Sequence, residues 1–110
     1  MDRRQSPRFR VHFQGSFTIE REDPVAGEGT VVDLSLGGCR VESELRVPTR
    51  IDLELLIYVP DVEEPIRIGW APVQWARDHD FGVKFARVAP DQQKRLRRVL
   101  QTLEPTRRDA

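Results

Sequence analysis

Apolar residues recur at every second position along most of the chain, which is the period of a strand with one buried face. Residues 11–19 alternate in this way, and residues 51–59 repeat the pattern. Shorter apolar segments follow at residues 30–32, 39–41, 66–75 and 81–85. The pattern predicts roughly six short antiparallel strands.

Clusters of turn-forming residues separate these segments. Residues 22–29 contain a proline and two glycines and predict the first turn. Residues 47–49 predict another, and Pro60-Asp61 ends the segment that begins at residue 51. Residues 78–80, Asp-His-Asp, predict a hairpin turn into the last strand.

The segment at residues 66–75 has an irregular alternation. Its apolar positions include Trp70, after which the parity changes to Val73 and Trp75. One extra residue that changes the inward face is typical of a β-bulge, and Pro72 is tolerated there. This parity places both tryptophans on the inward set, and we expect them to be core or sheet-face residues rather than platforms for stacking bases.

A helical period begins only after Pro90. Leucine and valine residues then recur at i, i+3, i+4 and i+7, from Leu96 to Leu103. We expect the polar side of this helix to be solvated, including its basic residues Lys94, Arg95, Arg97 and Arg98.

These elements predict an all-β fold with one helix: a six-stranded antiparallel β-barrel with a C-terminal α-helix packed across it. Residues 1–9 lack periodicity and contain Pro7, so they are expected to form a flexible arm. Residues 10–104 then form the barrel domain with its helix, and residues 105–110 a tail. A chain of 110 residues and 12.8 kDa has room for one core.

Charge is distributed unevenly although the formal net charge is zero. Residues 1–10 hold four arginines and one aspartate, which gives +3. Residues 91–110 hold six basic and three acidic residues, again +3, and residues 11–90 hold eight basic and fourteen acidic residues, which gives −6. A duplex-binding protein needs a broad basic face, so we expect a compact anion rather than nucleic acid as the partner.

The single cysteine, Cys39, excludes an intramolecular disulfide and fits a reducing compartment. No apolar segment is long enough to cross a membrane, and none follows the arginines in the manner of a signal peptide. We therefore expect a cytoplasmic protein without membrane insertion.

Two polar signatures stand out from this framework: Arg4-Gln-Ser-Pro-Arg8 and Asp33-Leu-Ser-Leu-Gly-Gly38. An arginine fork can make paired hydrogen bonds to a phosphate or to the O6/N7 edge of guanine. A carboxylate accepts from guanine N1–H and N2–H, a serine can bond phosphate or base, and two glycines allow close approach or a positive φ. By itself the second signature also suits a plain structural turn.

The two signatures together resemble the RxxxR and (D/N)xSxxG motifs of PilZ domains, bacterial receptors for cyclic di-GMP. The later strands, with Val73-Gln74-Trp75 and residues 81–85, and the closing helix are also similar, so the resemblance covers about residues 3–103. It implies that Arg4 and Arg8 hold guanine and phosphate.

The same resemblance assigns the remaining site residues and the ligand count. An arginine just before the first motif arginine implies two stacked cyclic di-GMP molecules, and Arg3 stands there. No other cofactor and no metal is expected. The ligand-binding set is Arg3, Arg4, Arg8, Asp33, Ser35, Gly37 and Gly38.

The implied function is a non-enzymatic receptor or adaptor. Nucleotide binding would order the arm over the barrel and change the surface shown to an unknown protein partner, in motility, biofilm or surface-attachment signalling. Two alternatives stay open: a PilZ-like interaction scaffold that binds no nucleotide, and a small barrel that binds single-stranded nucleic acid. An enzyme is the least favoured class, since nothing in the sequence supports a nucleophile–base pair of Cys39 with His12 or His79.

Overall fold

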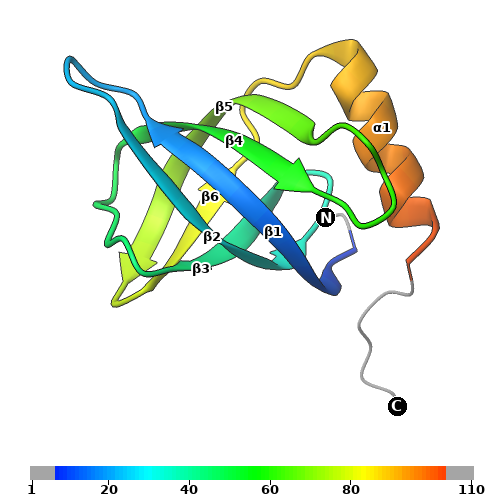
Figure 1. Ribbon diagram of the computed structural model, residues 1–110, viewed down its shortest axis with the longest axis horizontal. Helices are drawn as coiled ribbons and strands as arrows, with labels where there is room; N and C mark the ends of the chain where they lie inside the picture. The colour runs from blue at the N-terminus through cyan, green and yellow to red at the C-terminus, as the bar shows by residue number, and fades with distance from the viewer. Residues whose placement is uncertain (1–6, 104–110) are drawn as a thin grey trace, which may run out of the picture.

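Six strands and one helix form the structure, as the alternation predicts (Figure 1). The computed structural model describes residues 7–103. The elements are β1 (Phe9–Ile19), β2 (Val25–Leu34), β3 (Gly38–Ser43), β4 (Asp52–Tyr58), β5 (Ile66–Arg77), β6 (Asp80–Lys84) and α1 (Pro90–Gln101).

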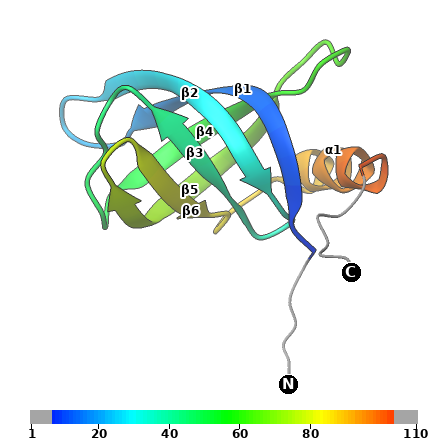
Figure 2. The same ribbon diagram turned by 90° about the horizontal axis from the view of Figure 1, so that it is seen from below.

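The strands close into a barrel in the order β1-β2-β3-β6-β5-β4, and every neighbouring pair is antiparallel. The β1–β4 pairing completes the ring, so that backbone groups along the strands find partners around it. This confirms the predicted fold class. Figure 2 shows α1 at the end of the barrel where β1 begins and β2 finishes, with the β1–β2 turn at the far end.

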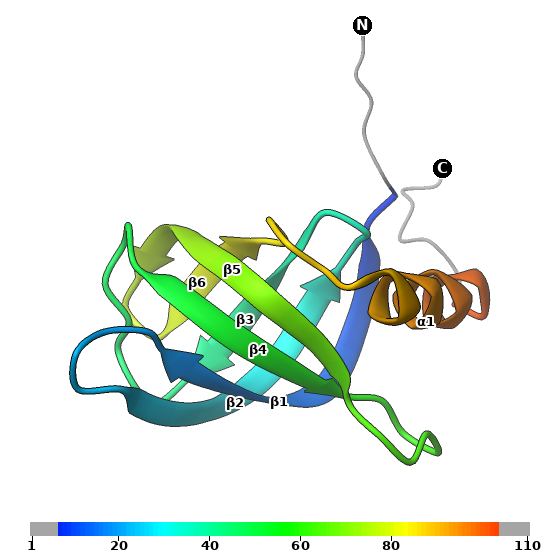
Figure 3. The same ribbon diagram turned by 90° about the horizontal axis from the view of Figure 1, so that it is seen from above.

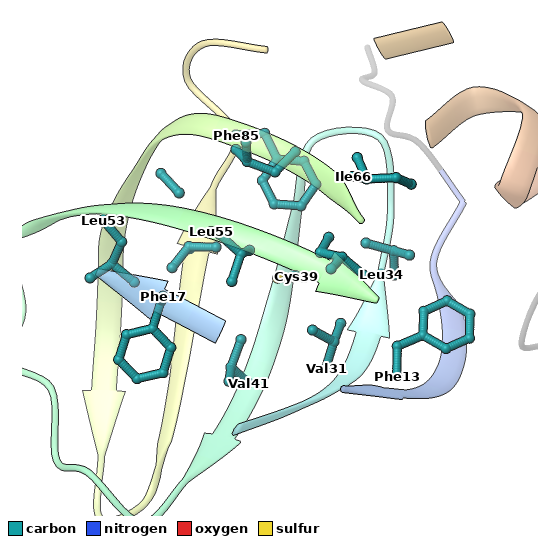
Figure 4. Close-up of a cluster of buried hydrophobic side chains, with 14 of the residues drawn as sticks. Phe13, Phe17, Val31, Leu34, Cys39, Val41, Leu53, Leu55, Ile66 and Phe85 are labelled. Carbon is teal, nitrogen blue, oxygen red and sulfur yellow. The ribbon is translucent and has the colours of Figure 1, made fainter. Parts of the chain in front are cut away.

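The barrel interior is filled by the apolar set of each strand (Figure 4). Leu53, Leu55 and Ile57 are fully buried, as the strict alternation of β4 predicts. Phe17 and Phe81 meet edge to face at a centroid distance of 5.2 Å. Aromatic pairs in this geometry contribute beyond their buried area.

Helix α1 begins at a proline in its first turn and buries Leu96 and Leu100. One of its basic residues is not solvated as expected. The Arg95 guanidinium donates to the carbonyl of Pro65 at 2.9 Å and to that of Glu64. Arg95 therefore fastens the β4–β5 loop, which extends past the barrel in Figure 3, to the helix.

The predicted turn at residues 22–29 was wrong in its second half, because β2 already begins at Val25. Gly27 and Gly29 lie inside the strand. A Cβ atom at Gly27 would be 2.6 Å from the Phe17 ring, and one at Gly29 would collide with the Glu42 carbonyl oxygen. These glycines permit close packing against the neighbouring strands and do not form a turn.

The irregular alternation in β5 is a bulge, but its tryptophans face outward. Leu53 pairs with Ala71 while Leu55 pairs with Ile68, so the register shifts between them. A second shift lies just before Trp75. Trp70 and Trp75 are 39% and 40% exposed, so their expected place on the inward set was wrong.

Candidate functional site

The β2–β3 connection is a tight turn closed by the buried Ser35. Its N–H donates to the Gly38 carbonyl at 2.9 Å, and its hydroxyl donates to the same oxygen at 3.3 Å. The Gly37 N–H in turn donates to the Ser35 hydroxyl at 3.2 Å. Ser35 thus shapes the turn, and its hydroxyl already has partners inside it.

The two glycines of the turn meet different needs. A Cβ atom at Gly38 would collide with the Val83 carbonyl oxygen of β6, whereas one at Gly37 would meet no atom within 4 Å. Neither glycine has a positive φ. Close approach, not unusual backbone geometry, is therefore the reason for Gly38, and exposed Gly37 leaves bare backbone beside the turn.

Arg8 and Asp33 bring the two sequence signatures together. Arg8 directly precedes β1 and Asp33 lies near the end of β2, and the antiparallel pairing of these strands places the two ends side by side. The Nη1 atom of Arg8 is 3.9 Å from Oδ1 of Asp33, and the side chains are 62% and 31% exposed. The other two predicted arm residues, Arg3 and Arg4, lie outside the described residues.

Cross-strand pairing aligns Asp33 with four residues on the neighbouring strands. Asp33 is the cross-strand partner of Arg10 on β1 and of Arg40 on β3. Arg40 pairs with Gly82 on β6, and Gly82 with Trp75 on β5. Directly opposed residues share one face of a sheet, here the outer face. We refer to Arg10, Asp33, Arg40, Gly82 and Trp75 as the outer row.

The far end of the outer row offers an aromatic surface. A Cβ atom at Gly82 would collide with the Trp75 indole, so the ring lies against the glycine backbone. Close to the middle of the row, Nη1 of Arg40 donates to Oδ2 of Asp80 at 3.3 Å. The sequence pattern did not assign Arg10, Arg40 or Trp75 to the site, because only cross-strand register brings them into one row with Asp33.

Cys39 lies beneath this surface in the core. Burial, and after it the negative charge of Asp33, raise the pKa of the Cys39 thiol well above its ordinary range, while Arg8 acts in the opposite direction. The thiol therefore keeps its proton at neutral pH and packs as a small apolar residue.

Residues 7–103 contain no group of three or more His, Cys, Asp or Glu side chains placed to hold a metal ion. The Nδ1 atom of His79 lies 3.1 Å from the Ser43 carbonyl oxygen, and His12 is exposed on β1. Among these same residues, no helix is both long enough and apolar enough to cross a membrane.

Comparison with known proteins gives one family and one fold. The sequence model of the PilZ domain matches residues 2–102. Eleven chains of solved structures match, among them the Bacillus subtilis inhibitor of motility, MotI/DgrA, with 22% identity and a TM-score of 0.63. The match covers 92% of this chain and 53% of that one, so the chain spans about half of its length and shares its fold. No curated protein matches the chain.

Proposed function

The chain belongs to the PilZ domain family, and on that premise we propose that it is a non-enzymatic receptor for cyclic di-GMP. The observation that carries the proposal is the 3.9 Å approach of Arg8 to Asp33. This contact places an arginine guanidinium, which can bind phosphate or guanine, beside the carboxylate and the glycine turn that suit guanine.

Binding in this proposal divides the work among the residues of the two signatures. Arg3, Arg4 and Arg8 supply guanidinium forks for phosphates and guanine edges, and Asp33 accepts from a guanine base. Gly37 and Gly38 let the ligand approach the backbone of the turn that Ser35 holds. With an arginine at position 3, the ligand is a stacked pair of cyclic di-GMP molecules.

The energetics favour exchange of the Arg8–Asp33 contact for a ligand. An exposed ion pair contributes only about 0–1 kcal/mol, and this one is long and solvated. Charge-assisted hydrogen bonds to a ligand contribute about 1.5–3 kcal/mol each, and ordering a segment costs about 2–5 kcal/mol. Four or five such bonds leave enough for micromolar binding, which needs about −8 kcal/mol.

The biological output follows from ordering the arm. A nucleotide held between the arm and the outer row changes the surface that a partner protein meets. The Bacillus subtilis protein of the same fold is an inhibitor of motility by name. We propose control of motility, biofilm formation or surface attachment, in the cytoplasm, as the process served here.

One observation favours the nucleic-acid alternative. Trp70 and Trp75 are exposed on the strand surface, and single-stranded nucleic acid binds by stacking bases on such rings. The acidic residues Glu42 and Asp80 on the same face oppose it. The scaffold alternative predicts no nucleotide binding at all.

Titration calorimetry with cyclic di-GMP separates these functions. The native chain should bind two molecules with micromolar affinity or better. Arg8→Ala and Asp33→Ala should each weaken this affinity by at least about ten-fold. Arg21→Ala, which removes an exposed arginine in the β1–β2 turn, is the matched control and should bind as the native chain does.

Three results would change the assignment. No binding by the native chain up to about 100 µM, an affinity near −5.5 kcal/mol, would refute the receptor and leave the scaffold. One nucleotide per chain would refute the stacked pair alone. Binding of single-stranded RNA that is equally strong and survives Arg8→Ala would favour the nucleic-acid alternative.

A further inference from the structure

An open groove of about 1490 Å³ lies next to the outer row, near the start of β2. Polar faces of β1, β2 and β3 and the β5–β6 turn line it. Its described lining contains no lysine or arginine, and Gly27 and Gly29 contribute backbone alone. Five acidic residues line it: Glu28, Glu42, Glu44, Asp78 and Asp80.

Two of these acids face each other directly across neighbouring strands. Glu42 on β3 is the register partner of Asp80 on β6. Like charges in such a pair are destabilising unless a cation lies between them. Arg40 supplies it, because its Nη1 atom is 3.3 Å from Oδ2 of Asp80 and 3.6 Å from Oε2 of Glu42.

Arg40 therefore lies between the acidic groove and the candidate nucleotide site. Its register partner on β2 is Asp33, the carboxylate of the candidate nucleotide site. The side chains of Arg40, Glu42 and Asp80 are 36%, 54% and 37% exposed. Ion pairs this exposed are weak, so a phosphate near Asp33 can compete for the guanidinium.

We propose that the groove binds a cationic, extended segment of a partner protein and that Arg40 couples this binding to cyclic di-GMP. The inference rests on the proposed function. A nucleotide phosphate draws Arg40 toward Asp33 and leaves Glu42 and Asp80 to an arginine or lysine of the partner. By linkage, binding of the partner segment raises the affinity for the nucleotide by the same factor, because it displaces Arg40 from the two acids.

The size and charge of the groove select this occupant. Small-molecule pockets measure about 300–1,000 Å³, so this open groove suits a peptide segment better than a single small cation. Its five acids complement the positive charge of a lysine- or arginine-bearing segment.

The first experiment uses a hexalysine peptide as the probe and measures its affinity with and without saturating cyclic di-GMP. On the native chain the nucleotide should tighten peptide binding about five-fold, and the peptide should tighten nucleotide binding by the same factor. In Arg40→Gln the acids are free in both states, so the peptide should bind tightly and the coupling should vanish.

The second experiment tests the competition for Arg40 with the nucleotide alone. Glu42→Gln/Asp80→Asn frees the guanidinium and should tighten cyclic di-GMP binding about five-fold. The same pair of changes in an Arg40→Gln background should have no further effect. Glu22→Gln/Asp23→Asn, an equal change of charge in the exposed β1–β2 turn, is the control and should leave the affinity unaltered.

Each failure has its own signature. If the native chain binds cyclic di-GMP but the coupling factor is one, or if Glu42→Gln/Asp80→Asn does not tighten binding, Arg40 is only a structural brace and the inference is overturned. If the native chain binds no cyclic di-GMP, the proposed function falls first. Nucleotide-induced dimers in sedimentation that disappear in Glu42→Gln/Asp80→Asn would assign the groove to a second copy instead of a partner.

Discussion

The two ends of β2 have similar sequences and different structures. Each end combines glycines with acidic and hydroxyl residues: Gly27-Glu28-Gly29-Thr30 at the start and Asp33-Leu-Ser-Leu-Gly-Gly38 at the finish. At the start the chain stays in the strand, and the residues are glycines because a neighbouring ring and a backbone carbonyl leave no room for Cβ atoms. At the finish it turns on the hydrogen bonds of Ser35. Glycine by itself therefore marks close approach as readily as a turn.

The charge around the two ends differs as much as the backbone. The start of β2 borders a groove lined by acids, and its end brings Asp33 beside Arg8 and between Arg10 and Arg40. A net charge of zero conceals this separation. Local charge, set by strand register, is what a ligand meets.

The largest expected effect tests the glycines at the finish of β2. Gly38→Ala should destabilise the fold by about 2–3 kcal/mol, since its Cβ atom collides with the Val83 carbonyl and overpacking against backbone forces a shift. Gly37→Ala meets open space at an ordinary φ and should stay within about 0.5 kcal/mol. Urea unfolding measures both, and equal losses would contradict the steric account.

A second prediction concerns the buried thiol beneath the Asp33 end. Because burial raises the pKa of Cys39, the folded state holds a proton that the unfolded chain loses above about pH 8.5. The free energy of unfolding should then fall by about 1.4 kcal/mol for each further pH unit. Urea unfolding between about pH 8 and pH 10 should show this slope in the native chain. Cys39→Ala should lack it, and an identical slope in both would place the titrating group elsewhere.

The smallest effect is spectral and distinguishes two equally exposed tryptophans. Trp75 lies in the outer row with Asp33, whereas Trp70 lies outside it with Arg87 5.4 Å from its ring. In Trp70→Phe, cyclic di-GMP should alter the emission of Trp75; in Trp75→Phe, the emission of Trp70 should be constant. Phenylalanine keeps a stacking face, so the affinity should change by about 1 kcal/mol or less. The reverse pattern would move the ligand off the outer row.

The fold was predictable wherever one periodic pattern determined which side was buried. The alternation in β4 and the helical spacing from Leu96 to Leu100 both gave the correct buried faces. Trp70 and Trp75 were misplaced because the alternation indicated one bulge, whereas β5 has two register shifts that change the direction of its side chains. Arg95 was misplaced because its carbonyl partners belong to a loop about 30 residues away.

Only those parts of the candidate site that are close together in the sequence could be predicted. Asp33, Ser35 and Gly38 form a local signature, and local hydrogen bonds shape their turn. Arg40 and Trp75 join Asp33 through pairing among four strands, and no short-range pattern carries that information. Cross-strand neighbours follow from register, which the whole barrel determines.

Amide chemical shifts during a titration with cyclic di-GMP would locate the nucleotide along the chain, since every non-proline residue reports separately. The largest shifts should fall on Arg8, Asp33 and the turn at Gly37 and Gly38, with the amides of Gly27–Gly29 changing much less. No shifts, or the largest shifts at Gly27–Gly29, would contradict the proposed binding site.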